Sequence, residues 1–378
     1  MTHDASRARL ARFRAAMLRR GVVQAVLLHP ATITYLTGFT ALLYSRAIIL
    51  MITQERTTLI VPGLEEEHAR QKAAVDEMLV YYEHPERGTR GENAYDMLLT
   101  ALDGGVVGLE YSTAPLALAE RLRAQGIQIA DIGGEILRMR LVKDPDEIER
   151  IRVAGQIAQV GVDVTLRESR PGVSQLAAET RGTQAMLERA AEIVPSATLV
   201  LLTFTTSGPE TSLPHLITTP RRFTAPDLVI HSRQVSVDGY RAELERTYFI
   251  GEPTAEQRRL FAVMQAAQWA AIEACRPGTP MSAVDAAARR IIQEAGFGER
   301  AIHRTGHGLG IEAHEPPYLR WDVDDPLEPG MVVSIEPGFY LEGLAGYRHS
   351  DTVLVTEDGY ELLTDYPRDL EAMILPAG

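Results

Sequence analysis

The sequence predicts two domains, an α/β layered domain followed by an α+β domain. Three observations lead to this fold class. The chain has 378 residues, which is too many for one ordinary hydrophobic core. Short β-rich runs alternate with helical runs up to about residue 132, as they do in α/β layers. Beyond residue 145, runs of strands are broken by paired helices, which favours helices on one face of a mainly antiparallel sheet.

The first domain, residues 1–132, is expected to begin with an amphipathic helix. In MTHDASRARLARFRAAMLRRG, apolar positions recur at helical spacing between arginines. Runs rich in branched and aromatic residues then predict strands at 23–30, 46–53, 57–62, 106–111 and 127–132. Helices are predicted between them, at 63–74, 94–102 and 114–126.

Residues 133–144 are expected to join the two domains, and the second domain then occupies 145–378. Asp144 is a good N-cap and Pro145 suits the first helical turn, so a long helix should begin here. The pattern predicts further helices and strands, with helices at 145–168, 174–191, 255–274 and 281–295 and strands at 197–206, 227–237, 239–250, 331–340 and 350–356.

Composition limits the class of protein and its partners. Hydrophobic residues make up 45% and charged residues 24% of the chain, as in a soluble globular protein. The formal net charge of −13 argues against nucleic acid or an anionic membrane as a partner, because both would repel the protein. No apolar run approaches the ~20 residues that span a bilayer. The single cysteine, Cys275, excludes an intrachain disulfide framework. We therefore expect a cytoplasmic protein.

The segment GYRAELERTYF, residues 239–249, places charged residues in an apolar strand. Successive side chains of a strand point to opposite faces, so Arg241, Glu243 and Glu245 should share one face. The apolar run LVIHSRQVSV just upstream indicates that the sheet is buried. A row of charged groups in a buried sheet is costly unless the groups are paired or liganded.

Further polar residues gather towards the C-terminus. In GHGLG, glycines flank His307, which allows backbone or ligand to approach the imidazole closely. In SIEPGFY, Glu336 stands in an otherwise apolar strand. Together, Glu243, His307 and Glu336 form a carboxylate–imidazole–carboxylate set that suits Zn or Mn in a hydrolase. The sequence alone leaves open whether the three residues meet in space.

Five motifs follow one another in a fixed order: SGPETSLPH, GYRAELERTYFIG, HRTGHGLGIEAHEPP, LEPGMVVSIEPGFY and GYRHSDTVLVTEDG. Through them the chain resembles the pita-bread hydrolases, which include methionine aminopeptidases, prolidases, aminopeptidase P and creatinase. The resemblance covers nearly the whole chain. It implies a C-terminal pita-bread catalytic domain preceded by a smaller α/β creatinase-type domain.

The resemblance also implies that the metal site is incomplete. The peptidases of the family bind two metal ions through Asp, Asp, His, Glu and Glu. Here the first Asp falls on Ser232 and the last Glu on Ser350, while Glu243, His307 and Glu336 fill the other positions. A serine hydroxyl is neutral and a poor ligand for a hard divalent ion. We therefore expect no dinuclear centre, and our first interpretation is that no metal is bound.

The centre is also similar to that of creatinase, the family member that works without metal. Glu245 and Glu336 match the glutamates that hold its substrate's guanidinium, and His215 matches its acid–base histidine. The positions that match creatinase residues near the substrate carboxylate are Tyr44, Arg46 and Arg320. Arg241 stands where creatinase has a tyrosine, and we count it with Glu243 among the candidate substrate-binding residues. Its simplest interpretation is a partner that neutralises Glu243 and leaves Glu245 free.

The first functional expectation is a metal-independent hydrolase of a C–N bond in a small substrate that bears a carboxylate. His215 would move protons, while Glu245 and Glu336 would fix and polarise the reacting group. Arginine forks would orient the carboxylate.

Two alternatives stay open. One is an Xaa-Pro dipeptidase (prolidase) or aminopeptidase P that uses one Mn or Zn ion held by Glu243, His307 and Glu336, with His215 and His314 supporting the reaction. The other is a pseudoenzyme that binds a small ligand or a partner through the inherited pocket.

The resemblance to creatinase also implies a homodimer. There, the residues that match Tyr44 and Arg46 reach the substrate carboxylate of the partner subunit. We therefore expect a two-fold dimer in which each pocket borrows Arg46 from its neighbour.

Overall fold

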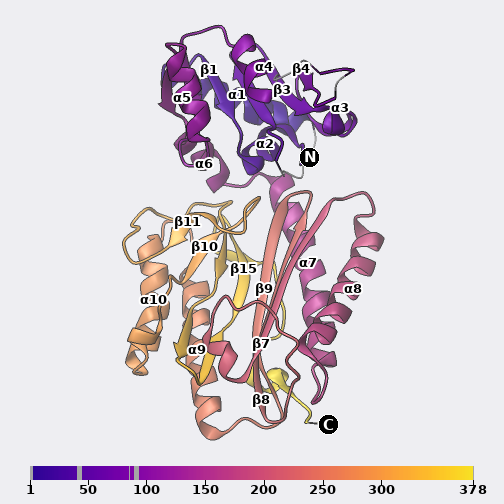
Figure 1. Cartoon of the computed structure of the whole chain (residues 1–378). Helices are drawn as coiled ribbons and strands as arrows, with labels where there is room; N and C mark the ends of the chain where they lie inside the picture. Colours follow the sequence, from indigo (N-terminus) through magenta and orange to yellow (C-terminus); the bar gives the residue numbers. More distant parts are fainter. Residues whose placement is uncertain (1–2, 41–44, 85, 89–92, 378) are drawn as a thin grey trace. The chain divides into compact units, whose positions relative to one another are not determined.

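The structure is a computed structural model that describes residues 3–40, 45–84, 86–88 and 93–377. Its contacts divide the chain into two units, Met1–Arg140 and Leu141–Gly378. The predicted succession of an α/β domain and an α+β domain is confirmed (Figure 1). The domain limits at residues 132 and 145 stay a prediction, and most of the expected join is helix α6 (Gly133–Leu141).

The first unit is a mixed sheet with helices around it. Its described strands follow the order β4-β3-β2-β1-β5-β6. They are β1 (Gln24–Leu27), β2 (Ile49–Thr53), β3 (Thr57–Pro62), β4 (Glu77–Tyr81), β5 (Val106–Leu109) and β6 (Gln128–Asp131). The helices are α1 (His3–Arg19), α2 (Pro30–Thr37), α3 (Glu66–Lys72), α4 (Ala94–Ala101) and α5 (Leu116–Ala124). Buried apolar side chains such as Val26 and Ile60 form the core between the layers.

Two elements of the first unit were not predicted. Helix α2 has the sequence PATITYLT, whose branched residues favour strands, but seven of its eight residues are buried and packing decides its conformation. Strand β4 has the sequence EMLVY and lies at the sheet edge, where most of its side chains are only half-buried. A short half-buried run of this kind gives a weak periodic signal.

The second unit begins with the long helix that the sequence predicted. Helix α7 (Pro145–Glu168) starts in a capping box, in which Asp144 Oδ1 accepts from the backbone N of Glu147 at 3.0 Å. In return, Glu147 Oε2 accepts from the backbone N of Asp144 at 2.8 Å. The other helices are α8 (Gln175–Ile193), α9 (Ala255–Ala274) and α10 (Met281–Glu294).

A large, mainly antiparallel sheet forms the body of this unit. Its described strands follow the order β11-β10-β12-β15-β9-β8-β7, with β16 beside β15 and β17 beside β9. They are β7 (Leu199–Ser207), β8 (Asp227–Val237), β9 (Tyr240–Ile250), β10 (Gly306–Gly308), β11 (Glu315–Leu319), β12 (Val332–Ile335), β15 (Ser350–Val355), β16 (Tyr360–Leu362) and β17 (Ile374–Leu375). A separate hairpin consists of β13 (Gly338–Leu341) and β14 (Ala345–Arg348).

The strand predicted at 331–340 is two strands. It breaks after Ile335, so that β12 belongs to the large sheet and β13 to the hairpin. Pro337 has no N–H for a ladder hydrogen bond, which explains a break at this position. Glu336 therefore lies at the end of a buried strand rather than inside one.

The two helix pairs, α7 with α8 and α9 with α10, pack on the same face of the large sheet (Figure 1). Arg233 of β8 donates to Thr165 of α7, and Gln268 of α9 donates to Asp351 of β15. Arg233 and Asp351 both pair with Leu244 of β9, so the three side chains point to one side. Their chain neighbours point to the opposite face, where the candidate site lies.

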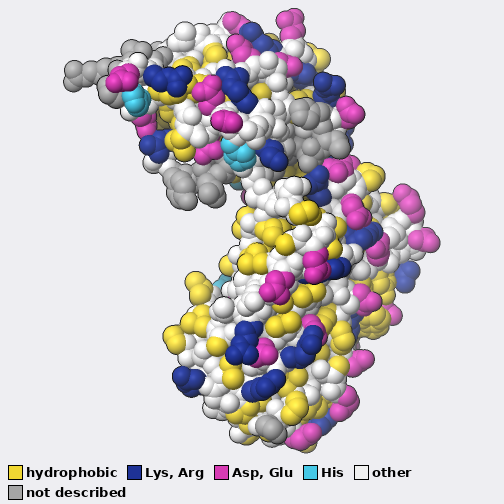
Figure 2. All heavy atoms as spheres, turned by 90° about the vertical axis from the view of Figure 1, so that its right-hand side faces the viewer, with side chains coloured by type: hydrophobic (Ala, Val, Ile, Leu, Met, Phe, Trp, Pro, Cys, Tyr) yellow, Lys and Arg dark blue, Asp and Glu magenta, His cyan; other side chains and the backbone are white. Residues whose placement is uncertain are grey.

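Charged side chains of both signs are interspersed on the face of the molecule that Figure 2 shows. Among the described residues, no helix is both long and apolar enough to cross a bilayer. Cys275 is buried at the end of α9.

Candidate active site

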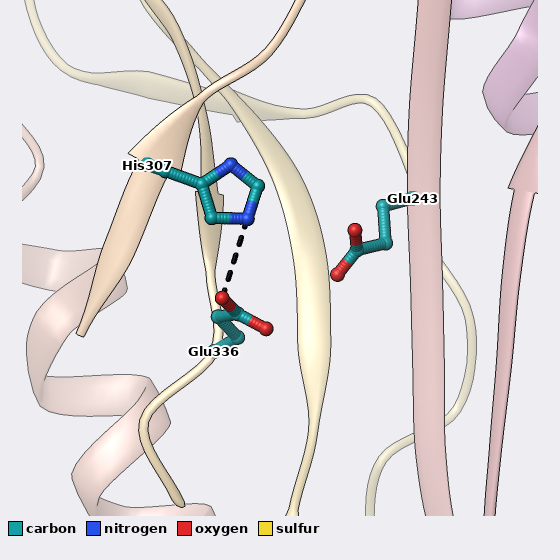
Figure 3. A group of neighbouring side chains, drawn as sticks. All are labelled: Glu243, His307 and Glu336. Atoms are coloured by element: carbon teal, nitrogen blue, oxygen red, sulfur yellow. Dashed lines mark ion pairs between the residues drawn. The ribbon is translucent and has the colours of Figure 1, made fainter. Parts of the chain in front are cut away.

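Three side chains of ligand type converge on the sheet face opposite the helices (Figure 3). Glu243 lies on β9, His307 on β10 and Glu336 directly after β12. One ligand atom of each residue lies within 4.8 Å of the others. The structure thus brings together the set that the sequence singled out.

The ring of His307 is oriented by contacts at both of its nitrogens. Its Nδ1 lies 3.1 Å from the carbonyl oxygen of Gly308, and because a carbonyl only accepts, Nδ1 carries the proton. Its Nε2 lies 3.2 Å from Glu336 Oε1 and forms an ion pair with this carboxylate when the ring is protonated. Burial works to lower the pKa of His307, but the Glu336 and Glu243 carboxylates outweigh it and raise the pKa.

The glycines beside His307 are required by strand packing. A Cβ atom at Gly306 would lie 2.0 Å from the carbonyl oxygen of Ser334, and one at Gly308 would lie 2.4 Å from that of Pro316. Backbone, rather than ligand, is therefore what approaches these glycines. Strand β10 fits between β11 and β12 only because both positions lack a side chain.

Glu243 is surrounded by neutral hydrogen-bond donors. Gln234 Nε2 donates to Glu243 Oε2 at 2.6 Å, and Ser350 Oγ donates to Glu243 Oε1 at 2.8 Å. Ser334 Oγ lies 2.7 Å from Ser350 Oγ and extends this cluster. Burial and then the nearby Glu336 carboxylate raise the pKa of Glu243. For Glu336, burial is outweighed by His307, which holds its pKa well below the usual range.

Glu245 is not free, because Arg348 of β14 binds it through both oxygens. Arg348 Nε donates to Glu245 Oε1 at 2.5 Å and its Nη2 donates to Oε2 at 2.7 Å. Both side chains are almost fully buried. Burial raises the pKa of Glu245 to about 7 while Arg348 opposes this shift, and Glu245 in turn raises the pKa of Arg348 well above its ordinary value. The guanidinium therefore keeps its charge and favours an ionised partner.

Arg241 does not neutralise Glu243, contrary to the expectation from the sequence. Its Nε donates to the carbonyl oxygen of Ile311 at 3.1 Å, and its backbone N donates to that of Gly310 at 2.7 Å. The physical reason is that the segment after β10 covers this end of β9 and offers its carbonyl oxygens to the guanidinium.

A cavity of about 960 Å³ opens beside the three ligand-type residues. Its lining includes the predicted residues His215, His314, Arg320 and Glu336, together with Arg348. Arg320 pairs with Asp322 at the rim. Of the three residues expected near a substrate carboxylate, Arg320 lines this cavity.

His314 is a neutral donor at the edge of this cavity. Its ring stacks on His307 with centroids 3.6 Å apart. Arg304 Nη2 lies 3.1 Å from His314 Nδ1, and because a guanidinium only donates, Nδ1 is unprotonated and Nε2 carries the hydrogen. Burial, followed by the positive field of His307, lowers the pKa of His314 to about 4.

The sequence analysis missed a network behind the cavity. Arg348 Nη1 donates to Tyr340 Oη at 3.0 Å, and this hydroxyl lies 2.9 Å from His303 Nε2. Arg348 Nη2 donates to the carbonyl oxygen of Pro214, the residue before His215. Arg348 stands in the quoted motif GYRHSD, so the signal was present, but nothing in the sequence shows that this arginine reaches Glu245.

Two predicted residues of the first unit remain untested in their roles. Tyr44 lies outside the described residues. Arg46 is partly exposed, and its Nε lies 2.7 Å from Glu83 Oε2 within the same unit.

Comparison with known proteins shows the family of this chain. Residues 149–357 match the model of metallopeptidase family M24, and residues 9–142 match that of the creatinase/prolidase N-terminal domain. The chain belongs to metallopeptidase family M24. The predicted resemblance to the creatinase and prolidase family, and with it the prediction of a C–N hydrolase, is confirmed.

Solved structures of M24 enzymes are similar over nearly the whole chain. The prolidase from Pyrococcus horikoshii OT3 is 27% identical with a TM-score of 0.85, covering 96% of this chain and 99% of its own. The dipeptidase PepE from Mycobacterium ulcerans is 28% identical with a TM-score of 0.86, covering 100% and 99%. The X-Pro aminopeptidase from Thermotoga maritima MSB8 is 26% identical with a TM-score of 0.85, covering 97% and 99%.

The first expectation about metal needs correction. We expected no metal, yet the chain belongs to a metallopeptidase family and its Glu243, His307 and Glu336 converge. The alternative, one ion at these three residues, fits this geometry. The sequence shows that serines replace two of the family's ligands, at Ser232 and Ser350. It does not show that ligand atoms of the other three residues lie within 4.8 Å of one another.

Proposed function

We propose that the chain is a dipeptidase of the Xaa-Pro type that hydrolyses a C–N bond in small substrates with a carboxylate, using one Mn or Zn ion. Glu243, His307 and Glu336 would hold the ion. The observation that carries the proposal is that ligand atoms of these three residues lie within 4.8 Å of one another. Three protein ligands with an open position are typical of a catalytic ion.

The donor set suits a divalent cation. His307 Nε2 points towards Glu336 Oε1, 3.2 Å away, while its Nδ1 is fixed on the Gly308 carbonyl oxygen. Such a second partner is what orients a histidine ligand. The nearby Glu336 carboxylate helps to raise the pKa of Glu243, and a bound cation would relieve this repulsion. When bound, the ion polarises the carbonyl group of the scissile bond.

The surrounding residues bind and orient the substrate. Arg320 and Arg304 give the cavity positive charge for a carboxylate, which a guanidinium can hold with two hydrogen bonds. His314 presents its Nε2–H as a donor for charge that develops on the carbonyl oxygen. His215 lines the same cavity and would move a proton to the leaving nitrogen.

A metal-independent reaction is the second candidate. The observation in its favour is that Ser232 and Ser350 occupy two of the family's ligand positions. His215, Glu245 and Glu336 would then carry the chemistry. Against it, Glu245 already accepts two hydrogen bonds from Arg348, so it cannot also hold a substrate guanidinium through both oxygens.

One experiment separates the two candidates. The purified protein is depleted with EDTA, its metal content is measured, and a panel of Xaa-Pro dipeptides is tested before and after Mn or Zn is restored. We expect about one ion per chain, with turnover that disappears in EDTA and returns with metal. Turnover that persists in metal-free protein would refute the single-ion proposal and support the second candidate.

Matched variants make the test specific for the three ligands. Glu243→Gln should reduce metal affinity roughly 100-fold or more, because it replaces a charged ligand atom by a neutral one. Glu357→Gln, at an exposed turn, serves as the control and should bind metal as the wild type does.

A further inference from the structure

Glu243 is a buried carboxylate to which, in the described part of the chain, only neutral groups donate hydrogen bonds. Its side chain lies in a residue that is 5% exposed. Gln234 Nε2 donates to its Oε2 at 2.6 Å, and Ser350 Oγ donates to its Oε1 at 2.8 Å. Arg241, on the same strand face, is turned to the carbonyl oxygen of Ile311 instead. A buried charge is costly unless it is paired or liganded, so these two donors carry part of the stabilisation that a cation would otherwise supply.

The donor to Oε1 is the end of a chain of two hydroxyl groups. The one hydrogen of Ser350 Oγ must point to Glu243, because a carboxylate only accepts. Ser334 Oγ lies 2.7 Å from Ser350 Oγ and therefore donates to it. Hydrogen bonds in a chain polarise one another, so Ser334 strengthens the bond from Ser350 to Glu243. Ser334 is directly opposite His307 in the ladder between β12 and β10, which places the chain on the face of the candidate metal site.

The donor to Oε2 comes from the other side of Glu243. Gln234 on β8 is directly opposite Glu243 on β9, whereas Ser350 lies on β15. Each oxygen of the carboxylate is thus fixed by a neighbouring strand. The group cannot rotate without breaking one of the two hydrogen bonds.

The position of Ser350 gives this arrangement a chemical meaning. Ser350 falls where the peptidases of the family carry a glutamate ligand. A serine hydroxyl is a poor ligand for a hard divalent ion, but it is a good hydrogen-bond donor to a carboxylate. On this side of Glu243 the chain therefore offers a neutral donor and not a place for a second cation.

We propose that Ser350, Ser334 and Gln234 are positioning residues of a one-ion centre, in which they hold the Glu243 carboxylate in place and substitute for a second cation. This inference rests on the proposed function, from which it takes the single ion. The three residues act through Glu243, as the hydrogen-bonding partners of metal ligands generally do.

Metal affinity and stoichiometry test the proposal. The full-length protein is freed of metal with EDTA, dialysed and titrated with Mn in a calorimeter, and we expect one ion per chain. Ser350→Ala and Gln234→Met should each weaken Mn binding by roughly 10- to 100-fold, and Ser334→Ala should weaken it less. Ser236→Ala is the matched control, because Ser236 is equally buried on this face but pairs with Arg241. It should bind Mn as the wild type does.

A spectroscopic probe separates positioning from a purely structural role. Co²⁺ bound in place of Mn has visible absorption bands that depend on the arrangement of its ligands. Ser350→Ala should change these bands, and Ser236→Ala should leave them unchanged. Urea unfolding of the metal-free variants shows whether they fold. A lower free energy of unfolding in Ser350→Ala, with wild-type Mn affinity and wild-type Co²⁺ bands, would show that the hydroxyl is only structural.

The outcomes separate this inference from the proposed function. If the wild type binds one ion and Ser350→Ala and Gln234→Met bind it equally well, the inference is overturned and the dipeptidase proposal stands. Two ions per chain would also overturn the inference. One ion and weakened variants, without turnover of any Xaa-Pro dipeptide, would support the inference and refute the dipeptidase. A wild type that binds neither Mn nor Co²⁺ would overturn both.

Discussion

At the scale of single residues, ion pairs determine which carboxylates of the candidate site are already neutralised. Arg348 forms an ion pair with Glu245, and Arg246 forms one with Asp351 on the helix-covered face. Glu243 and Glu336 are left to His307. Glu243 and Glu336 therefore share one imidazole, and a divalent ion would balance their charge.

The pair between Glu245 and Arg348 leads to a stability prediction. Glu245→Leu should lower the free energy of unfolding by about 3–5 kcal/mol, because it leaves the buried Arg348 guanidinium without its partner. The double variant Glu245→Leu/Arg348→Met should recover part of this loss, since both charges are then removed. Urea unfolding of the wild type and the variants measures these differences. A cost below about 1 kcal/mol for the single variant would mean that the pair behaves like a surface ion pair.

Residue patterns in the sequence predicted which carboxylates lie at the candidate site, but they did not predict which side chains contact them. The row of Glu243 and Glu245 on one strand face follows from the two-residue period of a strand, and the register confirms it. The partner of Glu245 could not be derived, because Arg348 lies 103 positions further along the chain. Periodicity describes one element at a time and carries no information on which distant side chains meet.

At the scale of elements, β10 depends on its glycines. Gly306→Ala should lower the free energy of unfolding by about 1–3 kcal/mol, because its Cβ would lie 2.0 Å from the carbonyl oxygen of Ser334 and the strands must separate. The same displacement moves His307, so metal affinity should fall as well. Denaturant unfolding and metal titration measure the two effects. Gly359→Ala, where the nearest atom lies 3.6 Å away, is the control, and an equal loss in both variants would contradict the argument.

Element length decides which strands and helices the sequence could predict. The long elements α7, β8 and β9 match their predicted ranges closely because many residues repeat one period. The three-residue strand β10 and the proline-containing β11 were not predicted, since GHG and EPPYL contain residues that disfavour strands. These short strands carry or flank His307, so the candidate metal site lies where local sequence signals are weakest.

At the scale of the whole molecule, two buried histidines predict sensitivity to acid. Arg233 Nε donates to His231 Nε2, and the backbone N of Thr247 donates to His349 Nδ1, both at 3.0 Å. Both accepting nitrogens must be unprotonated. Burial, together with a neighbouring arginine, lowers the pKa of both histidines well below the usual range.

The sign of the pH effect follows from these lowered pKa values. Below about pH 6.5 the unfolded chain binds protons that the folded chain cannot, so the free energy of unfolding falls by up to about 1.4 kcal/mol per pH unit for each histidine. Above this pH the contribution is fully present. Glu245 acts in the opposite sense, because burial raises its pKa to about 7.

Urea unfolding between about pH 5.5 and 8 measures this effect. The free energy of unfolding should fall less steeply towards acid pH in His231→Gln than in the wild type. The exposed His68→Gln should match the wild type, and equal slopes in all three would contradict the prediction.

Arg46 leads to a prediction about the assembly of two chains. Arg46 pairs with Glu83 on the surface of the first unit, and both side chains are about half exposed. Such a pair contributes about 0–1 kcal/mol, so a stronger partner can bind the guanidinium in its place at little cost.

We expect a two-fold dimer in which Arg46 binds the substrate carboxylate of the neighbouring subunit. Arg46→Ala should then weaken ligand binding by about 2–5 kcal/mol without changing metal content, whereas Arg56→Ala, which also removes an exposed paired arginine, should have no effect. Light scattering at micromolar concentration measures the assembly. A monomer there, or an Arg46→Ala variant that binds its ligand normally, would show that the site is complete within one chain.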